Sequence, residues 1–164
     1  MSPELRFESG LTQTLPRLRR FAHALSRDAS DADDLAQMTI ERALRSRSQW
    51  QEGTRLDSWL YKIMRNLWID TVRSRGRRVK YEAPPEAAEA IGHDPRDAIE
   101  AEIDLRRVMS AMDRLPDEQR EVVALILIEG FGYRETAEML GLPIGTVSSR
   151  LVRGRTALLA LLGE

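Results

Sequence analysis

The sequence predicts an all-α protein of two small helical domains joined by a flexible acidic linker. Apolar residues recur at helical spacing along nearly the whole chain, and no segment sustains the alternating apolar and polar pattern of a strand. A third observation is that residues 79–95 have little apolar material to bury, which is typical of a linker. With 164 residues and 42% hydrophobic side chains, the chain can form one ordinary core or two small ones.

Two helices open the first domain, which we place at residues 1–78. Apolar spacing predicts the first helix over residues 11–26. The second is expected over residues 30–45, because the Ser30 hydroxyl can accept a hydrogen bond from an open backbone N–H at the helix start. Its first turn is acidic, which suits the positive end of the helix dipole, and contains Asp31, Asp33 and Asp34.

A long third helix completes this three-helix domain after a loop at residues 46–53 that contains Trp50. Thr54 and Asp57 form a start that is similar to a capping box, and we expect the helix to run to about Arg75. Its core face carries apolar residues at helical spacing, namely Leu56, Leu60, Ile63, Met64 and Leu67.

The acidic linker is expected at residues 79–98, where Pro, Glu and Ala are frequent and periodicity is weak. The second domain, residues 99–164, begins with a helix at residues 99–115 that Pro116 ends. A helix with an acidic first turn follows at residues 117–129, and two shorter helices complete a four-helix domain.

Charge is distributed unevenly, although the net charge is only −1. Residues 1–78 hold 15 basic and 10 acidic side chains, residues 79–98 hold 2 and 5, and residues 99–164 hold 8 and 11. Within the acidic last third, residues 145–156 carry three arginines and no acid. Because DNA binding depends on local basic patches, this cluster is more informative than the net charge.

The spacing of residues 133–162 is typical of a helix-turn-helix. Ala137 is small enough for a second helix to cross closely, Gly141 permits a tight turn, and Val147 seats the second helix in the core. The same helix turns a further set of residues inward: Leu151, Gly154, Leu158 and Leu161 or Leu162. The alternative to a DNA-binding motif is a plain corner of two helices with solvated arginines.

The outward face of that second helix is short, polar and basic, which suits a DNA major groove. Arg153 is suited to guanine, and Thr146 and Ser149 to base edges or phosphates. Val152 shares the outward face, while Arg150 and Arg155 flank it toward the DNA backbone.

A stripe beside the core face of the long third helix interleaves cations, an aromatic ring and an amide. Its members are Arg55, Trp59, Lys62, Asn66, Asp70 and Arg73. Aromatic rings stack on unpaired bases, Asn can read an exposed Watson–Crick edge, and Lys or Arg binds phosphate, so the stripe predicts capture of single-stranded DNA. Packing at the edge of the core is the alternative role for Trp59 and the favoured one for Trp68, whereas the alternative for the loop residue Trp50 is to plug the end of the bundle.

Several function classes are disfavoured by composition. The chain has no Cys and two His, which leaves little for a zinc site, a thiol nucleophile or a conventional triad, although an all-carboxylate site remains formally possible. No calcium-loop pattern follows Asp31, so we predict no metal and no cofactor. We expect a cytoplasmic protein without membrane insertion, because no signal peptide and no spanning apolar run is visible.

With these motifs in place, the chain resembles the extracytoplasmic-function group of the sigma-seventy family over about nine tenths of its length. Residues 31–44, DADDLAQMTIERAL, are similar to the family segment that docks on the clamp of the large subunit of core RNA polymerase. This resemblance implies a polymerase-binding surface that includes Asp31, Asp33, Asp34, Leu35, Gln37 and Ile40.

Two further segments carry the resemblance to promoter readers. Residues 57–78 are similar to the family segment that melts and reads the minus-ten element, which implies that the stripe faces the opened strand and that the loop from Trp50 to Arg55 closes over a flipped base. Residues 115–158 resemble the family's minus-thirty-five reader. Ser148 stands where many relatives carry a long basic residue, so base preference there is not carried over.

The resemblance implies a sigma-2-like bundle, a sigma-4-like helix-turn-helix domain, promoter DNA and core RNA polymerase as partners, and often an anti-sigma factor as inhibitor. The function predicted is promoter recognition for a polymerase, without catalysis by the chain itself. Two rival interpretations are an autonomous helix-turn-helix regulator that dimerises on a palindrome, and a sigma-like decoy that sequesters a regulator. The stripe on the third helix argues against the former, and the intact basic faces argue against the latter.

Overall fold

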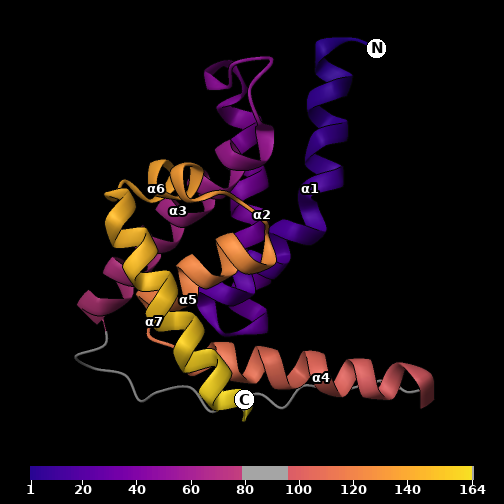
Figure 1. Cartoon of the computed structure of the whole chain (residues 1–164). Helices are drawn as coiled ribbons and strands as arrows, with labels where there is room; N and C mark the ends of the chain where they lie inside the picture. Colours follow the sequence, from indigo (N-terminus) through magenta and orange to yellow (C-terminus); the bar gives the residue numbers. More distant parts are fainter. Residues whose placement is uncertain (79–95, 164) are drawn as a thin grey trace.

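The computed structural model describes residues 1–78 and 96–163, and within these ranges every regular element is helical (Figure 1). The prediction of an all-α fold is therefore confirmed. The predicted linker at residues 79–98 lies largely outside the described residues, and its last three positions belong to a helix. The helices are α1 (Pro3–Ser26), α2 (Ala29–Arg45), α3 (Leu56–Arg78), α4 (Arg96–Asp113), α5 (Asp117–Val123), α6 (Tyr133–Leu140) and α7 (Ile144–Leu162).

Helix α1 begins eight residues before the position that periodicity predicted. Ser2 accepts a hydrogen bond from the Leu5 N–H and Pro3 occupies the first helical turn, a combination that favours a helix start. The extra turns carry Phe7, which is 1% exposed and belongs to the core. The prediction of residues 11–26 was too short because it started from the first strongly periodic stretch.

Two predicted caps are also corrected by the structure. Asp28, and not Ser30, caps α2, because its carboxylate accepts the Asp31 N–H at 2.9 Å. Asp and Ser are comparably good at this position, so composition alone does not choose between them. Helix α3 begins at Leu56 rather than Thr54, whose hydroxyl donates instead to the Gln51 carbonyl at 2.6 Å and so belongs to the preceding loop.

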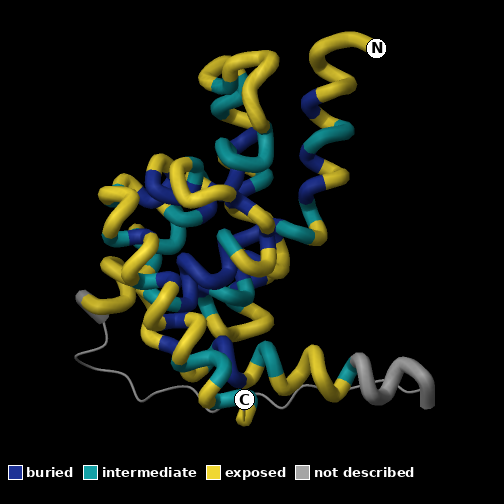
Figure 2. The backbone as a smooth tube through the Cα atoms, in the orientation of Figure 1, coloured by how far each residue is buried: buried dark blue, intermediate teal, exposed yellow. Residues whose placement is uncertain are grey.

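The first half of the molecule, residues 1–78, is a three-helix bundle whose core faces are those that periodicity predicted. Leu60 and Met64 of α3 are fully buried against α1 and α2, and Leu56, Ile63 and Leu67 are partly buried at the margin. The burial pattern along each helix is visible in Figure 2, where buried positions recur on the sides that face neighbouring helices. The loop before α3 contains a short 3₁₀ turn, Arg47–Gln49.

In the second half, residues 96–163, the predicted helix at residues 117–129 changes its winding part-way. It is α-helical to Val123 and continues as a π-helical turn, Ala124–Ile128, in which the Glu129 N–H donates to the Ala124 carbonyl at 2.9 Å. Gly130 then has φ +77°, which lets the chain reverse and bring Phe131 inward, where it is 2% exposed.

The predicted helix-turn-helix geometry is present in α6 and α7. Gly141 adopts φ +65°, and the N–H groups of Gly141 and Leu142 donate to the carbonyls of Glu138 and Ala137, which is a Schellman ending of α6. Val147, Leu151 and Gly154 of α7 are buried, as the helical wheel predicted.

The two halves pack against each other along a contact that we call the seam, formed by residues 1–78 on one side and 96–163 on the other. Helix α3 lies next to α6, and α1 next to α5 (Figure 1). Phe131 packs on Tyr61 with ring centroids 5.2 Å apart, and Tyr61 on Phe21 at 4.9 Å. The assignment of the halves as separate domains stays a prediction.

Candidate nucleic-acid interface

The predicted stripe of α3 is on the surface. Lys62, Asn66, Asp70 and Arg73 are exposed at intervals of three or four residues, which aligns them along one side of the helix. Trp59 is half-buried within the same stripe. In the structure, these cationic, aromatic and amide side chains therefore lie on one side of α3, at or near the surface.

A hollow adjoins this stripe between the end of α2 and the middle of α3. It has a volume of about 140 Å³ and is lined by Trp59, Asn66 and Asp70 of the stripe together with Arg42 and Gln49 among others. These side chains supply an aromatic face, amide donors and acceptors, a carboxylate and a guanidinium. Those are the groups that stack on an unpaired base and hydrogen-bond its edges.

Trp50 and Trp59 both pack on Phe7, with ring centroids 5.6 and 6.2 Å away. The loop aromatic thus closes the end of the bundle, which was one of the two alternatives for Trp50. Its indole N–H is buried and has no acceptor among the described residues. The guanidinium of Arg47, in the same loop, lies over the Phe7 ring at 5.0 Å, which is a second contact between the loop and α1.

Trp68 is half-buried at the edge of the core, and the guanidinium of Arg75 lies over its ring at 5.7 Å.

Arg55 lies just before α3 and binds the second half. Its guanidinium donates to Glu135 of α6 at 2.7 Å and to Asp57 at 2.9 and 3.1 Å, and it lies over the Phe131 ring at 4.8 Å. Burial alone would raise the pKa of Asp57, but the hydrogen bonds from Arg55, the Ser58 N–H and Arg17 outweigh it and lower this pKa.

The predicted base-reading face of α7 is exposed. Ser148, Ser149, Val152, Arg153 and Arg155 point to solvent, whereas Thr146 and Arg150 are half-buried. Arg150 lies 3.7 Å from Glu118 of α5. The exposed side of α7 is therefore basic, and the helix itself, Ile144–Leu162, contains no Asp or Glu.

The predicted polymerase-binding residues on α2 divide into three groups. Asp33, Asp34 and Gln37 are exposed, and Ile40 is half-buried. Asp31 receives two hydrogen bonds of 2.7 Å from Arg75 of α3, which hold the pKa of its carboxyl below the ordinary value. Leu35 is 2% exposed and packs in the core, so its side chain does not form part of a docking surface.

Sequence reasoning missed the polar centre of the seam. The carboxylate of Glu129 is 1% exposed and accepts hydrogen bonds from Arg20 at 2.7 and 2.9 Å, Arg17 at 3.2 Å and the Tyr61 hydroxyl at 2.7 Å. Burial, with the hydrogen bond to Glu129 adding to it, raises the pKa of Tyr61. The partners lie 68 to 112 residues away along the chain, so no local pattern marks them.

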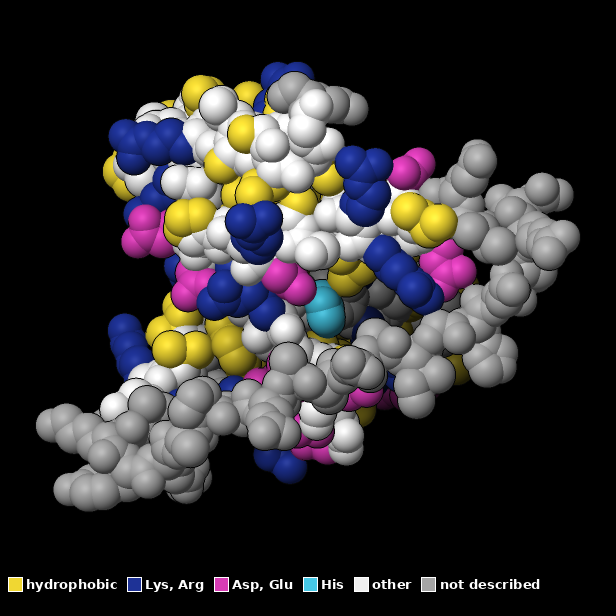
Figure 3. Space-filling view, turned by 90° about the horizontal axis from the view of Figure 1, so that it is seen from below, with side chains coloured by type: hydrophobic (Ala, Val, Ile, Leu, Met, Phe, Trp, Pro, Cys, Tyr) yellow, Lys and Arg dark blue, Asp and Glu magenta, His cyan; other side chains and the backbone are white. Residues whose placement is uncertain are grey.

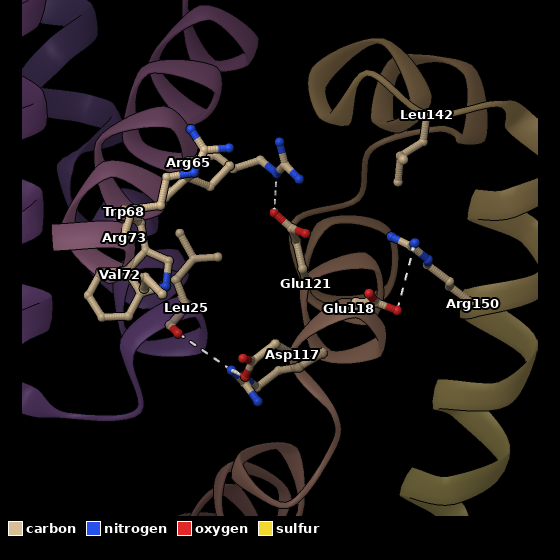
Figure 4. Close-up of a pocket in the computed structure, with 12 residues that line it drawn as sticks. Leu25, Arg65, Trp68, Val72, Arg73, Asp117, Glu118, Glu121, Leu142 and Arg150 are labelled. Carbon is tan, nitrogen blue, oxygen red and sulfur yellow. Dashed lines mark hydrogen bonds and ion pairs between the residues drawn. The ribbon is translucent and has the colours of Figure 1, made fainter. Parts of the chain in front are cut away.

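A second set of polar contacts lies lower on the seam, around a cavity of about 480 Å³ (Figure 4). Arg65 of α3 donates to Glu121 of α5, whose pKa is raised because burial outweighs the effect of that arginine. Arg120 is 1% exposed and donates to the carbonyls of Ala24 and Leu25 at the end of α1 and to that of Leu115. Two carbonyls in the last turn of α1 are thereby satisfied from the second half.

The described residues contain no group of three or more side chains placed to ligate a metal ion. Among them, no helix combines the length and the apolar character needed to cross a bilayer.

Family models match both halves of the chain. Residues 11–65 match the "Sigma2 domain of PhyR", and residues 105–158 match "Sigma-70, region 4". The ECF RNA polymerase sigma factor EcfG of Rhodopseudomonas palustris is 38% identical over 148 residues, which are 90% of this chain and 80% of that one. The chain belongs to the ECF sigma factors of RNA polymerase. The ECF sigma factor SigE of Mycolicibacterium smegmatis is 40% identical over 149 residues, and the match covers 89% of this chain and 57% of that relative.

Solved structures agree with this membership. This ECF sigma factor is similar to the sigma factor RpoE of Bartonella quintana, solved in complex with the anti-sigma factor NepR, with a TM-score of 0.81, 33% identity and coverage of 96% and 97% of the two chains. It is also similar to CnrH, solved in complex with the cytosolic domain of CnrY, with a TM-score of 0.70 and 25% identity over 99% and 90% of the chains.

Proposed function

We propose that this ECF sigma factor directs core RNA polymerase to promoters by reading two DNA elements with its two halves. Helix α7 reads the minus-thirty-five element as duplex in the major groove, and the stripe of α3 holds the minus-ten element as an opened strand. The enzymatic step belongs to the polymerase, and the factor itself catalyses nothing. We place this activity in the cytoplasm, where the polymerase works.

The observation that carries the proposal is the hollow beside the stripe. An autonomous duplex reader has no use for an aromatic side chain and an amide facing a small cavity, whereas a strand reader needs both for an unstacked base. Asn66 and Asp70 supply hydrogen-bonding groups on one wall, and Trp59 supplies a ring on the same helix.

The polymerase surface that we propose comprises the exposed start of α2, namely Asp33, Asp34 and Gln37, with the half-buried Ile40 at its edge. We also propose an anti-sigma partner. This proposal is supported by the similarity to RpoE and CnrH, both of which were solved in complexes, the former with an anti-sigma factor.

Free factor is expected to bind DNA weakly. Seen from below, the described surface mixes cationic and acidic side chains instead of presenting one basic field (Figure 3). The chain is also nearly neutral, with a net charge of −1, so its sequence-independent attraction to phosphate is expected to be small.

Run-off transcription tests the proposal. Purified bacterial core polymerase and a promoter library are combined with wild-type protein, Asn66→Ala, Arg153→Ala and the control Arg19→Ala, which removes an exposed cation on α1. We expect promoter-dependent transcripts that weaken roughly tenfold in the first two variants, in line with about 1–3 kcal/mol for one base contact, and are unchanged in the control.

Two other results would contradict the proposal. Tight binding of the free protein to a palindromic duplex, with no transcript above core polymerase alone, favours an autonomous regulator. Full inertness toward both core polymerase and DNA, with retained binding to an anti-sigma protein, favours a decoy.

A further inference from the structure

An apolar side chain lies in the middle of the exposed side of α7. Val152 is 62% exposed and belongs neither to the core of the described residues nor to its margin. Helix α7 packs on α4, α5 and α6 through its opposite side, where Val147, Leu151 and Gly154 are buried. Packing among the described residues therefore does not account for a valine at this position.

Helix propensity does not account for Val152 either. A β-branched side chain loses rotamer freedom in a helix, so Ala, Leu, Lys or Arg would favour α7 more strongly at an exposed position. An isolated apolar residue needs no explanation on most of a protein surface. Val152, however, lies on the side of α7 that we propose to face a DNA major groove.

Two arginines flank Val152 on the surface of α7. Arg153 follows at about 100° around the helix axis, and Arg155 lies at about 60° in the other direction. Both side chains are exposed. Guanidinium groups bind phosphate or read guanine, so DNA that contacts both arginines lies over the valine between them.

Small side chains allow the backbone of α7 to approach base edges closely on this side. One turn before Val152 lie the exposed Ser148 and Ser149, and two turns before it lies Gly145, where an added Cβ would meet no atom within 4 Å. One turn after it, the Thr156 hydroxyl donates to the Val152 carbonyl at 2.8 Å and is thus directed at the helix backbone. The methyl groups of Val152, which extend only two bonds from Cα, can therefore reach a base.

We propose that Val152 is a specificity-determining residue that reads the C5-methyl group of a thymine in the minus-thirty-five element. Thymine is the base that presents a methyl group in the major groove, and an apolar side chain is its complement. The inference rests on the proposed function of α7. Consecutive Cα atoms are about 3.8 Å apart, close to the rise of about 3.4 Å per base pair, so this thymine lies within about two base pairs of the guanine read by Arg153, on either strand.

Uracil tests the methyl contact, because it differs from thymine only in lacking the C5-methyl group. Run-off transcription with purified bacterial core polymerase uses the strongest promoter from the library, with each thymine of its minus-thirty-five element replaced in turn by deoxyuridine. We expect one replacement to lower transcription by the wild type about three- to tenfold, as the loss of one buried methyl group implies. The same replacement should leave transcription by Val152→Ala unchanged, because this variant lacks the partner of the methyl group.

Ile144→Ala is the matched control. Ile144 is another exposed aliphatic residue of α7, at 52%, and lies two turns before Val152 at the start of the helix. We expect the control variant to keep the full sensitivity to uracil. Because both side chains are exposed, both variants should retain the helix content of the wild type, which circular dichroism measures.

The possible failures are distinguishable. Wild-type transcription that no uracil replacement lowers would overturn the reading of a methyl group and leave the proposed function intact. A Val152→Ala protein with the sensitivity of the wild type would have the same meaning, as would a minus-thirty-five element without a thymine within about two base pairs of a guanine. A wild-type protein that gives no promoter-dependent transcript would overturn the proposed function, and this inference with it.

Discussion

At the scale of single residues, Glu129 is the side chain that makes the most hydrogen bonds across the seam among the described residues. It is a buried carboxylate that receives hydrogen bonds from two arginines and a tyrosine, and all of these partners belong to the other half of the chain. A buried charge is costly unless it is paired and hydrogen-bonded, so the position of this one side chain is tied to the whole seam.

Glu129→Gln is expected to lower the free energy of unfolding by about 1–3 kcal/mol. The amide keeps the shape but removes the charge and places an N–H₂ group against donors of Arg20, Arg17 or Tyr61. Urea unfolding measures the change. Glu118→Gln is the matched control, because Glu118 is exposed and its contact with Arg150 is 3.7 Å long, so its loss is expected to change stability by less than about 0.5 kcal/mol. Equal stability of the two variants would contradict the role given to Glu129.

At the scale of secondary-structure elements, the crossing of α5 and α7 depends on the absence of a side chain at Gly154. A Cβ atom there would lie 2.7 Å from Val123 Cγ2, 3.2 Å from Gln119 Cβ and 3.3 Å from the Gln119 carbonyl oxygen. The backbone atom cannot move aside as a flexible side chain can, so the two helices would have to separate.

Gly154→Ala is therefore expected to destabilise the second half by about 1–3 kcal/mol despite the better helix propensity of Ala. The control is Gly145→Ala in the same helix, where nothing lies within 4 Å of the added Cβ and a gain of up to about 1 kcal/mol is expected. Thermal unfolding of the two variants gives the comparison, and a stabilised Gly154→Ala protein would show that this helix contact is looser than described.

Periodicity located the helices and most of their buried faces, because burial of Leu60, Met64, Val147 and Leu151 leaves a repeat of 3.6 residues in the sequence. It failed at helix starts, where Asp28 and Ser30 are equivalent candidates, and at the π-helical turn, whose extra residue has no local signature. The spacing of residues alone predicted which side of α7 is exposed. The seam could not be predicted in this way, since the ion pairs of Arg17 and Arg55 with the second half join residues that are distant in sequence.

At the scale of the whole molecule, the seam makes the two halves one packing unit. It contains the aromatic cluster of Phe21, Tyr61 and Phe131, the Glu129 hydrogen bonds and the buried guanidinium of Arg120. Contacts of this kind couple the stability of the parts that they join.

The two halves of the free protein are therefore expected to unfold together. All three tryptophans, Trp50, Trp59 and Trp68, lie in the first half, whereas circular dichroism reports on helices of both halves. Urea transitions followed by tryptophan emission and by circular dichroism should coincide, which is the test of a single cooperative unit. Separate midpoints would show that the seam is too weak to couple the halves.

The side chain of Arg120 also sets an order of events during synthesis. It supplies the donors for the Ala24 and Leu25 carbonyls, yet it is 96 and 95 residues further along the chain. The growing polypeptide therefore completes α1 long before the donor of these two hydrogen bonds has been made. Each new molecule passes through a stage in which the Ala24 and Leu25 carbonyls lack this partner, and gains it only after most of the chain has been synthesised.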